Sequence, residues 1–512
     1  MQKLTLPAFL LVSFLATAQK KNTPPYFAAS ISADDMKRHL YIIAGPEMEG
    51  RDTPSPGLEK AADYIESHFK SLGLLPGNKD SYRQVYPIFM DSMTNASIGV
   101  NGTSFELNKD FQPYVSSNYT AEMRFSEIAF AGYGIVDGDI DNYQGVDVKG
   151  KLVMIVDGSP AGYKPSSIGS ASPANASKKI EKAREKGAAA VMIVYGNYPR
   201  KGFTSSTAYH LHGYKSTLSP LSFSISEVLA EQILGESGKG IIEKMKTAPL
   251  APAVYKSDID LGYSKDTRIV HASNVIGLLE GTDKKDEYVV LSSHYDHIGK
   301  KNDGTINYGA DDDGSGTVGI LELAEAFAKA KAAGKGPRRS ILFMTVSGEE
   351  RGLWGSEYYT NHPIYPLEKT MVDLNIDMIG RIGQEYLKEK DSVNYVYVIG
   401  DDKLSSDLTP ITEMINNKYS KMRLDRKYND PNDINRFYYR SDHYNFAEKG
   451  VPVIFYFNGV HADYHKPTDT PDKINYNLMA KRGQFVFYTA WEMANRSETL
   501  KRDLKLVKPK GF

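Results

Sequence analysis

Residues 338–350 read RRSILFMTVSGEE, and this stretch decides the fold class. Residues 341–344, ILFM, are apolar at consecutive positions, which is typical of a strand that is buried on both faces of a sheet. Two adjacent carboxylates, Glu349 and Glu350, follow the strand. A carboxylate at the rim of a core is costly unless a group of opposite charge pairs with it. The sequence therefore predicts a buried strand with a partner of opposite charge near its carboxyl end.

Further apolar strands and a long amphipathic helix lie in the same half of the chain. The predicted strands are 287–294 (EYVVLSSH), 338–348, 369–380, 394–400 and 451–459, and the predicted helix is 314–334. Continuous apolar strands separated by helices are typical of an α/β fold, with a mixed, largely parallel sheet flanked by helices. Ligands of such sheets bind at the carboxyl ends of the strands.

The chain divides into segments of different composition. Residues 1–18, MQKLTLPAFLLVSFLATA, combine an early lysine, an apolar stretch and a small-residue end, which predicts a signal peptide cleaved after Ala18. The protein is then expected to be secreted or periplasmic. Residues 19–100 and 256–512 are predicted to form the catalytic domain, and residues 101–255, which are rich in short β segments and turns, are predicted to form an inserted domain.

Composition excludes several function classes. The 512 residues include 62 Lys and Arg and 63 Asp and Glu. This balance of charge gives no indication that the protein binds nucleic acid or an acidic membrane surface. After the signal peptide, no segment approaches the roughly 18 to 20 apolar residues of a membrane span. The chain has 0 cysteines, so any metal must be held by His, Asp and Glu.

Metal-ligating residue types follow successive predicted strands and loops. Each of these residues alone has an ordinary structural explanation, but together they indicate one site at one edge of the sheet. Imidazole nitrogens and carboxylate oxygens favour two divalent cations, with zinc the first choice. The candidates are His294, Asp296 and His297; Asp311, Asp312 and Asp313; Glu349 and Glu350; Asp377; and His461, Asp463, His465 and Asp469.

A two-metal hydrolase needs a bridging carboxylate between ions about 3.5–4 Å apart, and a short aspartate suits this role. Neighbouring residues at a strand end point in different directions, so Glu349 and Glu350 cannot bind one ion in the same way. One of the two is expected to coordinate a metal, and the other to act as general base toward the water.

Seven segments resemble the M28 family of zinc peptidases in order and spacing. They are MEGRDTPSPG, SNVIGLLEG, SSHYDHIG, GADDDGSG, SGEERGLWGS, NIDMIG and YHKPTDT, within about residues 45–475. The resemblance implies two zinc ions per chain and peptide substrates. It assigns the ligands as follows: His294 and Asp377 for one zinc, Glu350 and His465 for the other, and Asp312 as the bridge.

The same resemblance gives roles to three further residues. Glu349 becomes the general base, Asp296 the carboxylate that orients His294, and Tyr464 a group that stabilises the oxyanion. The middle of the chain resembles a PA (protease-associated) domain.

The implied function is a secreted zinc-dependent aminopeptidase, which removes N-terminal residues by a metal-bridging hydroxide with Glu349 as general base. Three alternatives stay open: a carboxypeptidase of the glutamate carboxypeptidase II type, a glutaminyl cyclase-like acyltransferase, and a non-catalytic binding protein. The preferred side chain, the oligomeric state and the role of the PA domain are also open.

Two other motifs are interpreted structurally. Residues 441–450 are predicted to form an N-capped helix closed by Gly450. His297 and His461 are expected to line the pocket or to lie on the surface.

Overall fold

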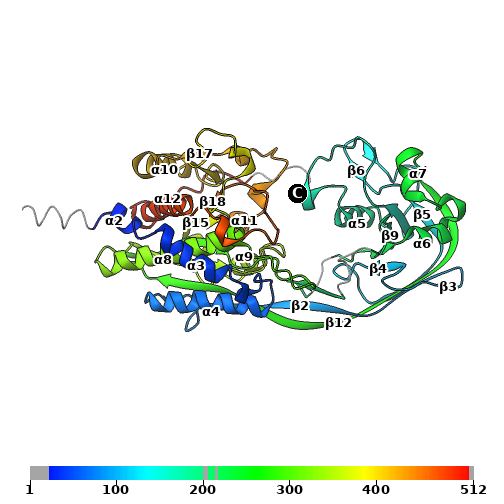
Figure 1. Cartoon of the computed structure of the whole chain (residues 1–512), viewed down its shortest axis with the longest axis horizontal. Helices are drawn as coiled ribbons and strands as arrows, with labels where there is room; N and C mark the ends of the chain where they lie inside the picture. Colours follow the sequence, from blue (N-terminus) through cyan, green and yellow to red (C-terminus); the bar gives the residue numbers. More distant parts are fainter. Residues whose placement is uncertain (1–21, 200–205, 214–216, 507–512) are drawn as a thin grey trace, which may run out of the picture. The chain divides into compact units, whose positions relative to one another are not determined.

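The chain folds into two units in the computed structural model, which describes residues 22–199, 206–213 and 217–506 (Figure 1). One unit comprises residues 1–86 and 271–512, and the other comprises residues 87–270. The second unit begins before, and ends after, the insertion predicted at 101–255. The predicted signal peptide lies outside the described residues. Among the described residues, no helix is both long and apolar enough to cross a membrane.

The sheet of the first unit is largely parallel, as the sequence predicts. Its four central strands are parallel neighbours, while β12 and β16 pair antiparallel at either side of them. In spatial order the strands are β17 (Arg423–Asp425), β16 (Tyr395–Ile399), β18 (Val453–Phe457), β15 (Thr370–Ile376), β13 (Lys284–His294), β14 (Arg339–Val346) and the last part of β12 (Ala253–Leu279), which also pairs with β1 (Leu75–Pro76).

The register brings the carboxyl ends of the central strands together. His294, the last residue of β13, lies opposite Val346, the last residue of β14. On its other side, β13 pairs Ser292 with Asn375 of β15. The residues that follow each strand therefore meet at one edge of the sheet, which is where the candidate ligands lie.

Helices cover both faces of this sheet. Phe343 of β14 contacts Phe69 and Phe327, with ring centroids 6.4 and 6.2 Å away, on one face. Its neighbours in the strand point to the other face and join a core cluster with Tyr359 and Phe446. The helices are α2 (Pro24–Ala28), α3 (Ala33–Ile43), α4 (Pro56–Ser71), α8 (Gly316–Ala332), α9 (Trp354–Asn361), α10 (Leu408–Ile415), α11 (His443–Glu448) and α12 (Tyr476–Asn495).

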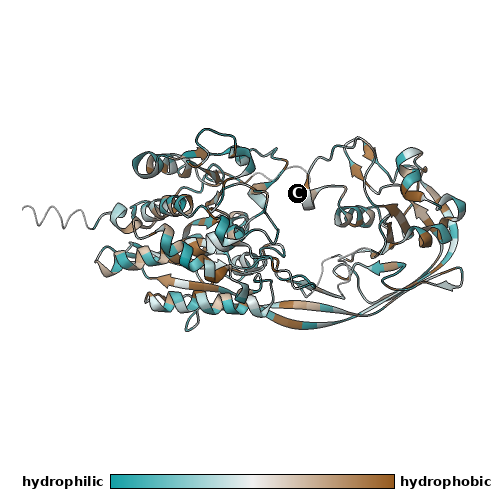
Figure 2. Ribbon diagram, viewed as in Figure 1, coloured by the Kyte–Doolittle hydropathy of each residue, from teal (hydrophilic) through white to brown (hydrophobic). Residues whose placement is uncertain are grey.

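Local sequence explains where these helices begin and end. The side chain of Ser55 accepts a hydrogen bond from the backbone N–H of Leu58, and Pro56 occupies the first turn of α4. Gly73, with φ of 71°, ends the segment. Helix α4 carries both hydrophilic and hydrophobic residues (Figure 2) and buries Leu58, Ala61, Ala62, Ile65 and Phe69, as expected of a helix with one apolar face.

The second unit has apolar cores of its own. Its strands β5 (Ala121–Phe130), β8 (Leu152–Val156), β9 (Ala190–Val194) and β11 (Leu221–Ile225) are parallel, with β4 (Phe111–Pro113) antiparallel to β11 and the first part of β12 antiparallel to β5. Strands β3 (Thr103–Ser104) and β10 (Thr207–His210) pair with β2 (Arg83–Val100), and β6 (Val136–Asp137) pairs with β7 (Ile140–Asp141). Its helices are α5 (Ala176–Glu185), α6 (Glu227–Leu234) and α7 (Ile241–Thr247). The PA-domain interpretation of this unit stays a prediction.

Candidate metal centre

A buried arginine fixes the turn that carries the three consecutive aspartates. Arg51 is fully buried, and burial lowers the pKa of its guanidinium to about 10. It connects the end of β13 to the residues just before the turn at Ala310–Ser315. Its guanidinium donates hydrogen bonds of 2.7, 2.7, 2.9 and 2.9 Å to the carbonyl oxygens of Tyr295, Ile43, Tyr308 and Gly309.

Asp469 holds the same turn from the other side. Its Oδ2 accepts hydrogen bonds from the backbone N–H groups of Asp311, at 3.0 Å, and Asp312, at 3.3 Å. Asp311 in turn accepts from the backbone of Gly380 at 2.7 Å and lies 3.2 Å from Nε2 of His461. These contacts set the orientation of the Asp312 side chain between them.

Asp312 lies between two histidines, and each of its carboxylate oxygens faces one of them. Oδ1 is 3.4 Å from Nε2 of His294, and Oδ2 is 3.0 Å from Nε2 of His465. Burial raises the pKa of Asp312, but the contacts with the two imidazoles outweigh burial and hold this pKa well below its usual range. A carboxylate in this position can bridge two ions.

His294 and Asp377 lie on one side of Asp312. Nε2 of His294 is 3.7 Å from Oδ1 of Asp377. Nδ1 of His294 is 3.1 Å from the backbone oxygen of Asp296 and 3.6 Å from its carboxylate. His294 also groups with Asp313 and Asp377 within 4.8 Å. However, Oδ1 of Asp313 already accepts from the backbone of Gly316 and Met378, at 2.8 and 2.9 Å.

Glu350 lies on the other side of Asp312, between two histidines. Its Oε2 is 3.1 Å from Nε2 of His465, and its Oε1 is 2.8 Å from Nδ1 of His297. His297 and His461 are 0% and 4% exposed, so the surface alternative for both residues is wrong. The only sequence signal for His297 is its place three residues after His294, and that spacing does not show which carboxylate it contacts.

Glu349 differs from Glu350 in its surroundings. Its Oε2 is 3.9 Å from Nε2 of His294, and its backbone N–H donates a 3.2 Å hydrogen bond to Asp296. Burial raises the pKa of Glu349 well above its usual range, and the charges of Glu350 and Asp377 add to this effect while His294 opposes it. A carboxyl group with a raised pKa is suited to accept and return a proton.

A small pocket opens beside Asp312, Glu349 and Asp377. Tyr464 lines it with its ring stacked on that of His465, at 3.9 Å between centroids, and Arg440 donates to the Tyr464 hydroxyl at 3.4 Å. Burial raises the pKa of Tyr464 well above its usual range, so its hydroxyl keeps its proton. The other lining residues are Met378, Phe437, Arg440, Phe455, Phe457 and Val460.

The predicted cap of the helix at 441–450 is wrong. Helix α11 begins at His443, and the side chain of Asp442 makes no capping hydrogen bond. Instead, Oδ1 of Asp442 accepts a 2.5 Å hydrogen bond from the hydroxyl of Ser356. His443 stacks on Phe455, with ring centroids 4.8 Å apart. The Asp442 carboxylate therefore makes a tertiary hydrogen bond to Ser356 in place of a local capping bond.

The residues on both sides of Asp312 fit a pair of zinc ions. Nε2 of His294 is buried and makes no hydrogen bond among the described residues, although the carboxylates of Asp312 and Asp377 lie 3.4 and 3.7 Å away. Buried polar atoms without partners are costly, and a bound cation would satisfy them. The donors are imidazole nitrogens and carboxylate oxygens, which are zinc ligands.

Comparison with known proteins relates this part of the chain to peptidases. Residues 274–490 match the model of peptidase family M28. The chain is 31% identical over 216 residues to a probable leucine aminopeptidase of Arthroderma otae, which is 41% of this chain and 55% of the relative. It is 30% identical over 159 residues to a probable glutamate carboxypeptidase of Arabidopsis thaliana, 31% of this chain and 21% of the relative. The chain thus spans between about a fifth and just over half of the length of these relatives.

The fold is also found in a solved structure. An aminopeptidase from Aneurinibacillus sp. strain AM-1 is similar over 95% of this chain and 99% of that chain, with a TM-score of 0.58 and 20% identity. At this identity the similarity concerns the fold alone.

Proposed function

Because residues 274–490 form a domain of peptidase family M28, we propose that the protein is a zinc-dependent aminopeptidase that removes N-terminal residues from peptides. The observation that carries this proposal is the position of Asp312, with one oxygen toward His294 and the other toward His465. The aminopeptidase named among the curated relatives supports the choice of the N-terminal end.

Five side chains hold the proposed metal pair. His294 and Asp377 would hold one ion, Glu350 and His465 would hold the other, and Asp312 would be shared. Bound zinc would supply Lewis-acid polarisation of the scissile carbonyl and of a water molecule. His297 and Asp296 orient ligands: Nδ1 of His297 lies 2.8 Å from Glu350, and the carboxylate of Asp296 lies 3.6 Å from Nδ1 of His294.

Glu349 handles the proton. Its carboxyl lies in the pocket beside Asp312 and Asp377 without sharing the His465 contacts of Glu350. It takes a proton from the attacking water and returns it to the leaving amine. Burial raises the pKa of Glu349, which favours a carboxyl that holds the proton between the two transfers.

Two features of the pocket act on the substrate. The Tyr464 hydroxyl keeps its proton and faces the pocket, so it donates a hydrogen bond to the oxyanion that develops on the scissile carbonyl. Phe437, Phe455 and Phe457 form an apolar wall, which favours substrates with an apolar residue at the cleaved end.

A carboxypeptidase is the second candidate. A glutamate carboxypeptidase is among the relatives, and Arg440 places a cation in the pocket wall. A guanidinium binds the carboxylate of a peptide C-terminus well. Arg440 donates to Tyr464, however, which gives it a role in the aminopeptidase proposal as well.

A peptide assay separates the two candidates. The zinc-loaded protein is incubated with a hexapeptide and with its C-terminally amidated form, with and without a chelator, and products are identified by mass spectrometry. We expect both peptides to lose residues from the N-terminus, and the chelator to stop the reaction. Shortening from the C-terminus that is blocked by amidation would replace the proposal with the carboxypeptidase.

A further inference from the structure

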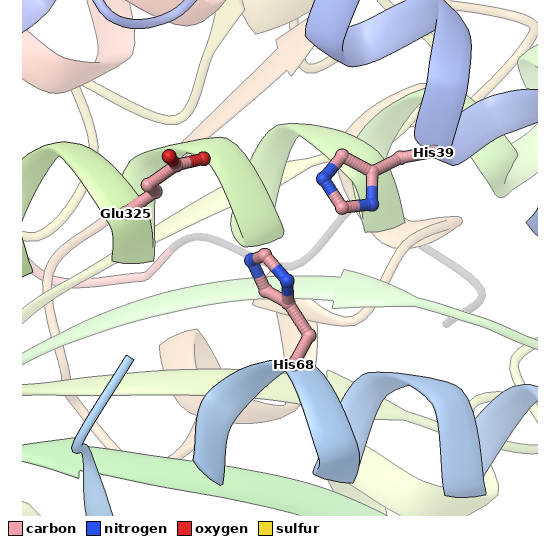
Figure 3. A group of neighbouring side chains, drawn as sticks. All are labelled: His39, His68 and Glu325. Atoms are coloured by element: carbon pink, nitrogen blue, oxygen red, sulfur yellow. The ribbon is translucent and has the colours of Figure 1, made fainter. Parts of the chain in front are cut away.

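A second group of metal-ligating side chains lies between three helices of the first unit. His39 comes from α3, His68 from α4 and Glu325 from α8 (Figure 3). One ligand atom of each lies within 4.8 Å of the others. Glu325 follows Gly316, the first residue of α8, by nine positions, or about 13 Å of helix. The group shares no residue with the candidate metal centre.

Each histidine of this group has one ring nitrogen that is available to bind a metal ion. Nδ1 of His39 is 2.7 Å from the hydroxyl of Tyr64, which leaves Nε2 for another partner. Nε2 of His39 and Nε2 of His68 are both buried without a hydrogen-bond partner among the described residues. Burial, with the charges of His68 and Arg38, lowers the pKa of His39 to about 4. The imidazole is therefore neutral at pH 7, which is the form that binds metals.

A buried carboxylate lies beside the same nitrogens. Glu322, one helical turn before Glu325, is 1% exposed, and its Oε1 is 3.8 Å from Nε2 of His39. Neither of its oxygens completes a hydrogen bond within the described ranges, although the backbone N–H of Ser32 lies close enough to lower its pKa. An unpaired ionised carboxylate in a buried position is strongly destabilising. Glu322 must therefore either have a cation beside it or carry a proton.

The neighbouring cations pair with carboxylates other than Glu322. Arg38 pairs with Asp35 at 2.6 Å, and Lys329 lies 3.2 Å from Oε1 of Glu325. The Lys329 contact leaves Oε2 of Glu325 for a further partner. In the part of the chain that the structure describes, His39 is the only basic side chain in ion-pair distance of Glu322.

We propose that His39, His68 and Glu325, with Glu322 beside them, bind one divalent transition-metal ion of the zinc type. Two imidazole nitrogens and carboxylate oxygens form a common zinc donor set. Ligand atoms within 4.8 Å of one another need only a small side-chain adjustment to surround one ion with bonds of about 2.0–2.2 Å. The ion joins α3 and α4 to α8, so its role is structural: it stabilises the folded state by mass action.

Zinc counting on the full chain tests this site. The wild type, Glu325→Gln and His68→Gln are saturated with zinc, passed through a desalting column and analysed by mass spectrometry for metal per chain. His271→Gln is the matched control, because His271 is an exposed histidine of the same unit. We expect three equivalents in the wild type and the control, and two in each of the other variants, with peptidase activity unchanged in all four proteins.

Thermal unfolding provides a second readout. Added zinc should raise the unfolding midpoint of chelator-treated wild type and control more than that of Glu325→Gln and His68→Gln. Equal zinc content and equal midpoint shifts in all four proteins would overturn the proposal and favour a proton shared by Glu322 and His39. Loss of activity together with zinc in the variants would also overturn it, because the change would then have reached the catalytic centre. If His68→Gln does not fold, Glu325→Gln provides the same comparison, because Glu325 is only half-buried.

Discussion

Glu349 and Glu350 are adjacent in sequence but have different contacts, and these contacts distinguish their roles. Both oxygens of Glu350 face histidines, at 2.8 and 3.1 Å, whereas Glu349 is 3.9 Å from its nearest histidine nitrogen. These contacts support the proposed roles of Glu350 as a metal ligand and of Glu349 in proton transfer.

The variant Glu349→Gln keeps the shape of the side chain but cannot accept the proton. We expect kcat to fall by about 10²–10⁴, the range of general acid–base catalysis. Zinc content should stay at the wild-type value, since Glu349 holds no ion in this account. The exposed Glu47→Gln serves as control. Loss of zinc from Glu349→Gln would show that this residue is itself a ligand.

His297→Ala tests the residue that contacts Glu350. Removing the imidazole leaves Oε1 of Glu350 without its 2.8 Å neighbour, so the ligand is less well oriented. We expect zinc affinity to fall about 10–100-fold, as is usual for residues that orient metal ligands. Competition with a fluorescent chelator measures the affinity, with His271→Ala as the exposed control. Unchanged affinity would mean that His297 only fills space.

Glu322 makes stability depend on pH when metal is absent. Burial, with the charges of Glu325 and Asp35, raises its pKa from 4.5 to about 8 in the folded protein. Between these values the folded state holds a proton that the unfolded state has released, so stability falls as pH rises, by up to about 1.4 kcal/mol per pH unit. The stabilisation is complete below the unfolded pKa and is lost as pH rises through the folded pKa.

In Glu322→Gln this contribution disappears. With chelator present, the urea midpoint of the wild type should decrease from pH 5 to pH 8 more steeply than that of Glu322→Gln. Parallel pH profiles for the two proteins would mean that Glu322 is ionised and solvated in the folded state.

Residue types at the site could be predicted from the sequence, but several contacts could not. The strand-end positions of His294, Glu349 and Asp377 follow from apolar runs that end just before them. The partners of His297 and His461 depend on side chains that are far away in the sequence. The sequence also does not predict that His39, His68 and Glu325 lie together, since each residue resembles an ordinary polar position of an amphipathic helix.

At the scale of elements, the geometry of the candidate metal centre depends on the turn Ala310–Ser315 being fixed at both ends. Arg51 connects this region to the end of β13, and Asp469 holds the backbone of Asp311 and Asp312. The segment MEGRDT therefore contributes structure to the site, although it lies more than 200 positions away from the strands.

Arg51→Lys tests this connection. Lysine has three donor hydrogens on one nitrogen and cannot reach four carbonyl oxygens that lie around a planar guanidinium. Each buried carbonyl left without a donor costs roughly 1–3 kcal/mol, so the thermal midpoint of the full chain should fall by several degrees. The exposed Arg38→Lys should cost much less. An equal midpoint in Arg51→Lys and wild type would contradict the assigned role.

The strands and helices were the more predictable elements. The predicted strand at 287–294 and helix at 314–334 correspond to β13 and α8, because long apolar runs and a continuous apolar stripe leave few alternatives. The side-chain cap predicted for the helix at 441–450 was wrong, because the carboxylate of Asp442, the residue before the helix, accepts from Ser356 on another helix. A short polar side chain can form a hydrogen bond either to the nearby backbone or to a residue distant in sequence. The sequence alone does not show which of the two hydrogen bonds forms.

At the scale of the whole molecule, two units with separate cores share one chain. Residues 87–270 contain two apolar clusters of their own, and the peptidase family match lies entirely in the other unit. The proposed chemistry needs only residues of the first unit.

The most direct test of the proposed function compares one substrate with its blocked form. Initial rates are measured for zinc-loaded protein with Leu-Gly-Gly and with N-acetyl-Leu-Gly-Gly. We predict hydrolysis of the free tripeptide after Leu, abolished by chelator, and a rate at least about 100-fold lower for the acetylated one, because an aminopeptidase recognises the free amine through interactions of several kcal/mol. Equal rates for the two substrates, or turnover that persists without metal, would contradict the assignment of a metal-dependent aminopeptidase.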